Sequence, residues 1–424
     1  MSRPKYWLII FGCAMNYADG ERVARILTEL KFQPAEKLEA AELVVLVSCS
    51  VRQKAEDRVF GLLKNLTRWQ AAKAGRQIFL TGCMVRPANQ KKLEGKFPQL
   101  TAALPIKEII RLPQILATPQ VPLSPKDYLK IVPQRSQVFS ALIPIMTGCD
   151  NFCSYCIVPY ARGREVSRSQ TEILRECRAA GQNGAREIFL LGQNVNSYGK
   201  KLGAFARLLR AACRLPKVER VRFTSSHPRD FDAATIATLA EEPKIERHVH
   251  LPAQHGSDKI LARMNRGYTA ANYLAKVEQL RKAVPEVSLT SDFIVGFPGE
   301  TEADFRRLCQ FYRQANFDFA FLASYSPRVG TPAAQLPRQV PEPVKRARLR
   351  RLNAILTKVT ATKLKQRVGQ MLQVLVEKTV RGVASGRSAE NFLVKFAAQK
   401  NLLGQIVPVK ITRAREFELW GEVI

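Results

Sequence analysis

The chain has no long hydrophobic run. Its longest purely aliphatic stretch is residues 43–47, whereas a membrane-spanning helix needs about 20 consecutive apolar residues. The apolar stretch 7–11, which follows Arg3 and Lys5 and precedes Cys13, is too short for the core of a secretory signal. We therefore expect neither a transmembrane helix nor a membrane partner.

Acidic residues are scarce relative to basic ones. The chain has 36 Asp and Glu against 67 Lys and Arg, which gives a formal net charge of +31. Such an excess favours a polyanionic partner, with nucleic acid as the first candidate and a generally solvated basic surface as the alternative. No basic amphipathic helix with a large aromatic face is evident, which argues against an anionic membrane surface.

The cysteines are odd in number. Nine cysteines in a chain of 424 residues argue against a disulfide framework and for thiols that stay reduced, so a cytoplasmic location is expected. Three of them, Cys149, Cys153 and Cys156, form a C-x3-C-x2-C run. Three closely spaced thiolates can hold a four-iron cluster and leave one iron without a protein ligand. A structural zinc site would need a fourth ligand, and the candidates His227 and His248 are distant in sequence.

The first hundred residues alternate between apolar strands and amphipathic helices, as in a βαβαβ unit. Apolar residues recur at helical spacing over 21–32 and 51–74. The predicted strands 6–11, 43–47 and 77–81 are followed in turn by Cys13, Cys49 and Cys83. Open α/β sheets bind ligands at the carboxyl ends of their parallel strands. If these strands are parallel, the three cysteines converge.

The remaining pattern predicts three further parts. Residues 105–138 contain six prolines and read as a linker after a first domain of 1–104. A second domain, 139–365, is expected to be a partial open (β/α)6 barrel, because six apolar strands alternate with helical patterns. Those strands are 141–146, 187–191, 218–224, 247–251, 287–295 and 317–325.

The last part, 366–424, is expected to be a small all-β barrel of the kind that binds oligonucleotides. Short alternating runs at 373–377, 391–396, 407–411 and 417–423 are separated by glycine and polar turns. From residue 341 to the end there are 17 Lys and Arg against 6 Asp and Glu, a net charge of +11. A helix before this barrel carries five cations within 345–351, and either a solvated face or a phosphate contact would explain them.

A set of ordered sequence blocks carries a family resemblance. Together with the C-x3-C-x2-C run they resemble the radical S-adenosylmethionine methylthiotransferases, and the match spans nearly the whole chain. The blocks are residues 12–16, 49–56, 82–84, 148–153, 162–168, 191–196, 225–228, 294–300 and 366–424. The resemblance implies a Rossmann-like βαβ domain, a partial radical S-adenosylmethionine barrel and a C-terminal TRAM barrel.

The resemblance also implies two [4Fe-4S] clusters and S-adenosylmethionine as cofactors. Cys13, Cys49 and Cys83 would bind a second, auxiliary cluster. One S-adenosylmethionine would donate a methyl group to a sulfur on that cluster, and another would be cleaved at the C-x3-C-x2-C cluster to a radical. The radical would take a hydrogen from an unreactive carbon, which then receives the methylthio group. An external electron donor is required, and the sulfur source stays open.

Cofactor-binding positions are implied as well. Tyr155 would lie against the adenine, Gly192 and Gln193 near the methionine amino group, and Gly296 and Gly299 beside the nucleoside. A buried core ring and ordinary turn glycines are the alternatives. Arg162 and Arg164 could bind phosphate or a cofactor carboxylate, and the sequence leaves this open.

Three positions depart from the family pattern. Ala253 and His255 stand where the family usually has valine and serine, and Thr147 stands where an acidic residue is common. These departures put in doubt the fine structure of a cofactor or substrate pocket. A metal site formed by His248 and His250 on one strand face is conceivable, but His250 belongs to the family block.

The expected substrate is N6-isopentenyladenosine next to the anticodon of tRNA, methylthiolated at C2. The blocks 15–16 and 194–196 are closer to this branch of the family than to its relatives. The alternatives are the same chemistry on N6-threonylcarbamoyladenosine in tRNA or on an aspartate of a ribosomal protein. The basic final domain argues against the protein substrate. A cluster carrier without catalysis would have no need for the open-iron motif.

Overall fold

The computed structural model describes residues 3–50, 53–116, 127–398 and 400–424, which divide into two compact units. Unit 1 comprises Met1–Gln137, Leu142–Asp150 and Cys156–Val166, and unit 2 comprises Val138–Ala141, Asn151–Tyr155 and Ser167–Ile424. Part of the expected linker, 117–126, lies outside the described residues, as do Val51 and Arg52 of one family block. Within the described chain no helix combines the length and apolar character needed to cross a membrane.

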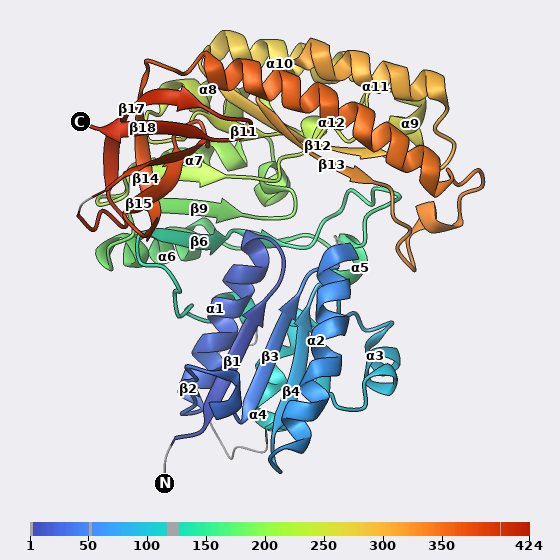
Figure 1. The fold of residues 1–424 in the computed structure, drawn as a ribbon, viewed down its shortest axis with the longest axis vertical. Helices are drawn as coiled ribbons and strands as arrows, with labels where there is room; N and C mark the ends of the chain where they lie inside the picture. The colour runs from blue at the N-terminus through green and yellow to red at the C-terminus, as the bar shows by residue number, and fades with distance from the viewer. Residues whose placement is uncertain (1–2, 51–52, 117–126, 399) are drawn as a thin grey trace. The chain divides into compact units, whose positions relative to one another are not determined.

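Unit 1 is built on a five-stranded sheet in which every pairing is parallel. Its strand order is β2-β1-β3-β4-β5, so the three strands predicted from the sequence lie side by side (Figure 1). The strands are β1 Lys5–Ile10, β2 Gln33–Pro34, β3 Leu43–Ser48, β4 Gln77–Gly82 and β5 Ala102–Leu104. The βαβαβ prediction is confirmed, and the short edge strands β2 and β5 were not predicted.

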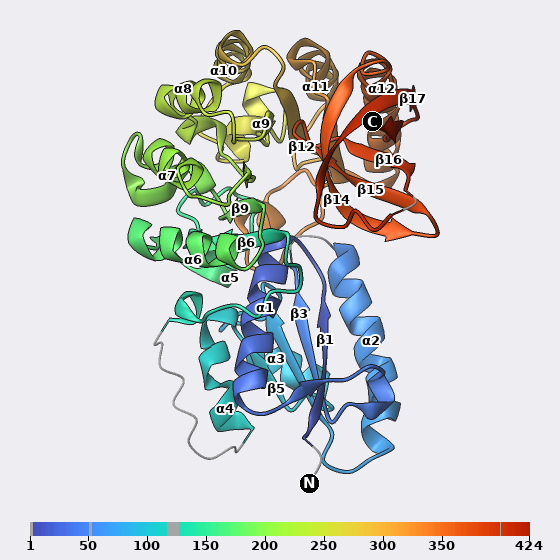
Figure 2. The same ribbon diagram turned by 90° about the vertical axis from the view of Figure 1, so that its left-hand side faces the viewer.

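Two helices cover opposite faces of this sheet, as Figure 2 shows: α1 Ala14–Glu29 and α2 Gln53–Ala71. The sheet has one hydrophobic core under each helix, and alternate residues of β3 pack into these two cores. Val45 packs in the core that contains residues of α1, and Val44 packs in the core that contains residues of α2. The strand is therefore buried on both faces, which explains its uninterrupted aliphatic sequence. Helix α1 begins at Ala14, earlier than the predicted 21, because its first two turns bury polar residues, Asn16 and Asp19, which interrupt the apolar pattern.

Unit 2 contains the expected partial barrel. One sheet has the order β10-β9-β6 and another β11-β12-β13. Val221 N donates to Lys244 O (2.8 Å) and Glu246 N donates to Val221 O (3.0 Å), which joins the two sheets. The strands are β6 Ser140–Pro144, β9 Glu187–Leu191, β10 Arg220–Phe223, β11 His248–His250, β12 Ser288–Val295 and β13 Phe319–Ser324. All six predicted strands are confirmed, although the first ends at Pro144.

Helices lie along the outside of these strands in an arc that Figure 2 shows. They are α6 Gln170–Gln182, α7 Ala204–Cys213, α8 Ala233–Glu241, α10 Ala270–Ala283 and α11 Glu302–Ala315. Serine or threonine caps with reciprocal side-chain bonds start three of them, at Ser169, Thr269 and Thr301. The helices thus form the outer layer of the partial barrel, and the carboxyl ends of its strands are the place where a ligand-binding site is expected.

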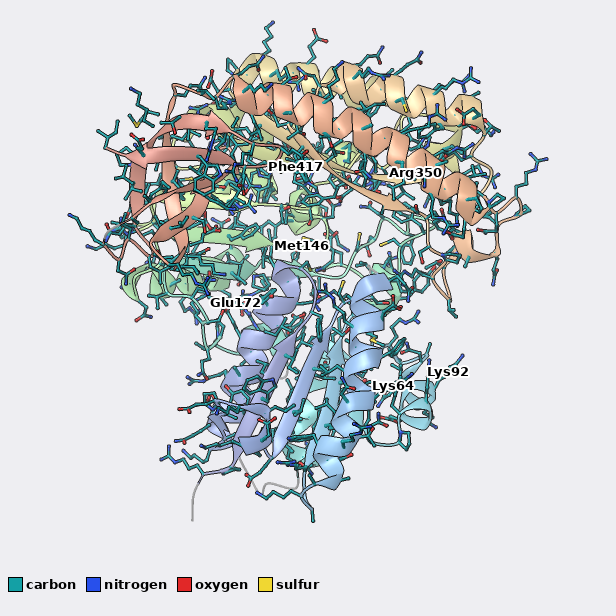
Figure 3. All side chains as sticks on the ribbon, in the orientation of Figure 1. Lys64, Lys92, Met146, Glu172, Arg350 and Phe417 are labelled. Atoms are coloured by element: carbon teal, nitrogen blue, oxygen red, sulfur yellow. The ribbon has the colours of Figure 1, made fainter. Side chains whose placement is uncertain are left out.

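The C-terminal β barrel is closed, with strand order β14-β15-β16-β18-β17. Its strands are β14 Met371–Val380, β15 Val383–Ser388, β16 Leu393–Ala397, β17 Ile406–Ala414 and β18 Leu419–Val423. Arg220 of β10 donates to the carbonyls of Arg387 (3.1 Å) and Gln373 (2.6 Å). Phe417, labelled in Figure 3, packs edge-on against Phe319 at 5.8 Å. These contacts dock the barrel on the strands of unit 2.

Strand β15 was not predicted, because its sequence is rich in small and polar residues. One of these small residues, Gly386, is required by the packing of the barrel. A Cβ at this position would lie 1.9 Å from the carbonyl oxygen of Leu375 on β14. Close approach of the two backbones therefore excludes a side chain at this position.

The Gly386→Ala variant is expected to lower the free energy of unfolding by about 1–3 kcal/mol, because the added methyl overpacks the barrel. Thermal unfolding followed by circular dichroism measures this. Gly61→Ala on α2 is the matched control, since a Cβ there has nothing within 4 Å. Equal melting temperatures for the wild type and the Gly386→Ala variant would contradict the expectation.

Candidate functional site

Cys13, Cys49 and Cys83 follow three neighbouring strands of unit 1, namely β1, β3 and β4. Cys13 caps the N-terminus of α1 and is exposed, whereas Cys49 and Cys83 are buried. Burial raises the pKa of the Cys83 thiol to about 12; Arg162 opposes the rise, and Cys49 and Cys13 add to it. The three thiols therefore lie within electrostatic reach of one another, at the edge where the strand order reverses.

Tight loops bring these cysteines together. A Cβ at Gly12 would lie 2.8 Å from the Cβ of Cys49, and a Cβ at Gly82 would lie 2.3 Å from the carbonyl oxygen of Ser48. Asn16 links two of the loops, since its Nδ2 donates to Ser48 O (3.1 Å) and its Oδ1 accepts from Cys13 Sγ (3.3 Å). The Asn16 position of the family block thus holds the first two cysteine loops in register.

Arg162 points its side chain at Cys83. Its Nε donates to Cys83 Sγ at 3.1 Å and its NH2 group to Asp19 Oδ2 at 2.5 Å. The sequence left open whether Arg162 binds phosphate or a cofactor carboxylate, and the structure instead gives it a thiol and an internal carboxylate. Asp19 was missed by sequence reasoning, because a lone acid in a helical pattern carries no sign of its partner.

The C-x3-C-x2-C run lies on one loop between β7 Met146–Thr147 and α5 Val158–Arg162. Cys149 and Cys153 are buried and Cys156 is half-buried. Gly148 has φ +80°, and a Cβ there would lie 2.1 Å from the carbonyl oxygen of Arg164. Cys149 N donates to Gly163 O at 3.1 Å. The glycine before the first cysteine is therefore required by close backbone packing.

Arg266 is a second buried arginine beside a cysteine, and sequence reasoning did not identify it. Its NH1 group donates to Cys153 Sγ (3.3 Å), and its NH2 group donates to Pro252 O (2.7 Å). The same NH1 group lies 3.5 Å from the hydroxyl of Tyr155. Tyr155 itself is half-buried and packs edge-on against Phe297 at 6.5 Å. Each of the two cysteine sets thus has one thiol that accepts from a buried guanidinium.

The other predicted binding residues lie at strand ends of unit 2. Gly192 and Gln193 directly follow β9, and Gly296 and Gly299 follow β12 with φ +71° and +82°. A Cβ at Gly296 would lie 2.3 Å from the Cγ of Lys345, so the close neighbour of this glycine is a side chain of α12 Glu342–Lys365.

Four buried polar atoms just after β9 and β10 have no hydrogen-bond partner within the described chain: Gln193 Oε1, Asn194 Oδ1, Ser226 Oγ and His227 Nε2. Buried polar groups are normally hydrogen-bonded. A polar ligand at the carboxyl ends of these two strands would satisfy them, so this edge fits S-adenosylmethionine or a nucleoside.

His227 contributes a ring N–H donor to this set. Its Nδ1 accepts from Arg229 N at 3.3 Å, so the ring proton lies on Nε2. Burial, with Arg266 and Arg229 nearby, lowers the pKa of His227 to about 2. A neutral imidazole with a buried, unpaired N–H in the described structure is a signal that the sequence alone does not carry.

The departure at His255 has a structural explanation. Its Nδ1 accepts from Ser257 N (3.0 Å), so its Nε2 donates to Glu300 Oε2 at 3.2 Å. The same carboxylate oxygen accepts from Gly296 N at 2.8 Å. His255 therefore supports the Gly296 loop through Glu300, and Ala253, which is fully buried, accepts from His255 N at 2.9 Å through its carbonyl oxygen.

No group of three or more His, Cys, Asp or Glu that could hold a single metal ion occurs in the parts of the chain that the structure describes. His248 and His250 both contact the hydroxyl of Thr290, at 2.8 and 2.9 Å. None of the nine cysteines, all within the described ranges, forms a disulfide. Two sets of three thiols, each with an arginine donor, are a donor set that suits iron–sulfur clusters.

Comparison with protein families divides the chain into three matches. Residues 143–312 match the radical SAM superfamily, 5–104 match the uncharacterized protein family UPF0004, and 368–424 match the TRAM domain.

Full-length relatives carry one common name. The chain is 43% identical over 437 aligned residues to the tRNA-2-methylthio-N(6)-dimethylallyladenosine synthase of Dictyoglomus thermophilum, covering 99% of both chains. It is 39% identical to the protein of the same name from Moorella thermoacetica, covering 100% of this chain and 99% of that one.

Among solved structures, the fold is similar to a radical S-adenosylmethionine methyltransferase, TsrM, from Kitasatospora setae, solved with cobalamin and a [4Fe-4S] cluster bound. The TM-score is 0.51 at 13% identity, over 91% of this chain and 81% of that one. At this identity the likeness concerns the fold alone.

His227 is expected to stay neutral, with its proton on Nε2, at every pH at which the protein remains folded, because its pKa is lowered to about 2. Nitrogen-15 NMR of labelled histidines tests this, since the chain has only four. The His227→Asn variant assigns the signal. An imidazole at this position that titrates near the ordinary value of about 6.5 would contradict the buried donor.

Proposed function

The chain belongs to the radical S-adenosylmethionine methylthiotransferases named tRNA-2-methylthio-N(6)-dimethylallyladenosine synthase, and from this premise we propose that it methylthiolates C2 of N6-isopentenyladenosine beside the tRNA anticodon. One observation carries the proposal. Two sets of three cysteines lie at carboxyl ends of strands, and in each set a buried arginine donates to one thiol. A tRNA substrate supports a cytoplasmic location.

Cys149, Cys153 and Cys156 would hold one [4Fe-4S] cluster, and Cys13, Cys49 and Cys83 a second, auxiliary one. When bound, the clusters and two molecules of S-adenosylmethionine supply the electron transfer, the hydrogen abstraction and the methylated sulfur. An external electron donor and a sulfur source complete the set of partners.

The protein's own residues would bind S-adenosylmethionine and the substrate base and orient them. Gln193, Ser226 and His227 present polar atoms that are buried and unpaired in the described chain, and these would bind S-adenosylmethionine or the base. Tyr155 would lie against the adenine, with Gly192 beside the methionine part. The main chain of the loop from Gly296 to Gly299, held through Glu300, would border the nucleoside, while the Lys345 side chain occupies the space beside Gly296. Because Ser226 and His227 are buried, a ligand bound to them would be largely kept from water.

A basic aromatic patch on the C-terminal barrel supports a nucleic-acid substrate. The side chains of Lys395, Arg413 and Arg415 lie over the ring of Trp420, at 5.6, 5.5 and 5.1 Å from its centroid. Glu418 orders the patch, since it accepts from Trp420 Nε1 at 2.8 Å. Lys395 and Arg415 are also paired with Glu418. An aromatic ring with cations beside it can contact both the bases and the phosphates of a nucleic acid.

The basic helix α12 contributes less than its composition suggests. Of its five clustered cations, Lys345 is paired with Glu342 (2.7 Å) and Arg348 with Glu300 (2.8 Å). Arg350, labelled in Figure 3, is exposed. Only part of this cluster can contact phosphate.

Mass spectrometry of tRNA nucleosides tests the activity directly. Anaerobically reconstituted protein is incubated with dithionite, S-adenosylmethionine, sulfide and tRNA that carries N6-isopentenyladenosine. We expect 2-methylthio-N6-isopentenyladenosine, its loss in Cys153→Ala, and its retention in Cys177→Ala, a buried helix cysteine outside both sets. Release of 5′-deoxyadenosine without the new nucleoside would sink the substrate assignment. N6-threonylcarbamoyladenosine tRNA and ribosomal protein would then be assayed.

Trp420→Ala is expected to weaken tRNA binding about 5- to 100-fold, because it removes a stacking face, while S-adenosylmethionine binding stays unchanged. Arg413→Gln should reduce the salt dependence of tRNA binding by about one phosphate contact. Filter binding over a salt series measures both effects, with Arg381→Gln in the turn between β14 and β15 as the matched control. Equal affinity of the wild type and Trp420→Ala would remove the patch from the tRNA interface.

A further inference from the structure

Arg162 is held from several sides within unit 1. Its side chain is 1% exposed, and its guanidinium contacts Asp19 (2.5 Å), Cys83 (3.1 Å) and the hydroxyl of Tyr128 (3.4 Å). Burial prevents salt and water from screening its charge. An arginine stays protonated in such a setting, so the cation beside Cys83 is permanent.

The main chain beside Arg162 is fixed as well. Gly163 O accepts from Cys149 N at 3.1 Å, and Glu165 N donates to Asp150 Oδ1 at 3.0 Å. The segment that carries Arg162 therefore holds the loop of one cysteine set by its backbone and reaches a cysteine of the other set by its side chain.

A purely structural ion pair would not require this geometry. Asp19 already supplies the opposite charge, yet the Nε–H of Arg162 is directed at a sulfur atom. That sulfur has Cys49 and Cys13 as electrostatic neighbours. Hydrogen bonds and positive charge at a cluster's sulfur ligands favour the reduced, more negative state.

We propose that Arg162, oriented by Asp19, is a positioning residue that places a fixed positive charge on Cys83 and so raises the reduction potential of the auxiliary cluster. This inference rests on the auxiliary cluster of the proposed function. It adds a role for a residue of the 162–168 block that the sequence left unassigned, and it makes Arg266 at Cys153 the counterpart for the other cluster.

The test isolates the auxiliary cluster. In a background with Cys149, Cys153 and Cys156 all changed to alanine, the reconstituted full-length chain is assayed for iron and its midpoint potential is measured by a redox titration followed by electron paramagnetic resonance. The variant is Asp19→Asn with Arg162→Gln. It removes both charges together, because loss of one partner alone would leave the other buried and unpaired.

We expect the double variant to shift the midpoint potential to more negative values, because Arg162 contacts the sulfur atom directly whereas Asp19 contacts only the guanidinium. The expected shift is about 59 mV, a tenfold change in the equilibrium ratio of a one-electron couple. Arg162→Lys, which keeps the charge without the directed Nε–H, should recover part of the shift. Arg266→Gln is the matched control, because in the wild type Arg266 contacts the loop of the other cysteine set, and it should leave this midpoint where it is.

The outcomes are distinguishable. An unchanged midpoint with full iron content in the double variant, with the fold verified by circular dichroism, overturns the role of Arg162. If the folded double variant loses its iron, Arg162→Lys decides: a midpoint more negative than that of the intact pair supports the role of Arg162, and an unchanged midpoint overturns it. If the background protein with intact Asp19 and Arg162 binds no cluster, the auxiliary site of the proposed function is wrong, whatever Arg162 does.

Discussion

Parallel strands end at the same edge of a sheet, and most of the chemistry assigned to this protein depends on that constraint. In unit 1 the edge gathers three cysteines from segments separated by more than 30 residues each. In unit 2 it gathers the unpaired polar atoms of Gln193, Ser226 and His227 after two neighbouring strands. Short loops are enough to hold these residues together, because the parallel register already places the carboxyl ends of neighbouring strands side by side.

Two buried arginines lie at these edges, and burying a charge carries a large desolvation penalty. Polar partners next to each guanidinium offset this penalty. Arg162 is matched by Asp19, and Arg266 by the carbonyl of Pro252 and the hydroxyl of Tyr268 (3.0 Å). A buried cation that lost such partners would carry the full desolvation penalty. Both arginines keep one donor for a thiol, so the groups that stabilise their positions also direct them at the cysteines.

The sequence allowed most elements to be predicted but few of these contacts. Apolar periodicity located the strands of both units, since buried parallel strands carry unbroken hydrophobic runs. It missed β15, where Gly386 is required by the Leu375 carbonyl rather than by strand propensity. It also missed Asp19 and Arg266, because a long-range polar partner leaves no periodic pattern. The doubt about His255 was resolved only by its contact with Glu300.

The sequence by itself determined which chemical groups are available. It contains one set of three closely spaced cysteines and one set of three distant cysteines that each follow a predicted strand, and it has a strong excess of basic residues. Local spacing and composition are properties of the chain, so they can be inferred before any fold is known. The tertiary structure alone decided which charges reach which sulfurs. Arg162 lies six residues after Cys156 in the sequence, yet its guanidinium contacts Cys83, because burial beside Asp19 is the position in which its charge is compensated.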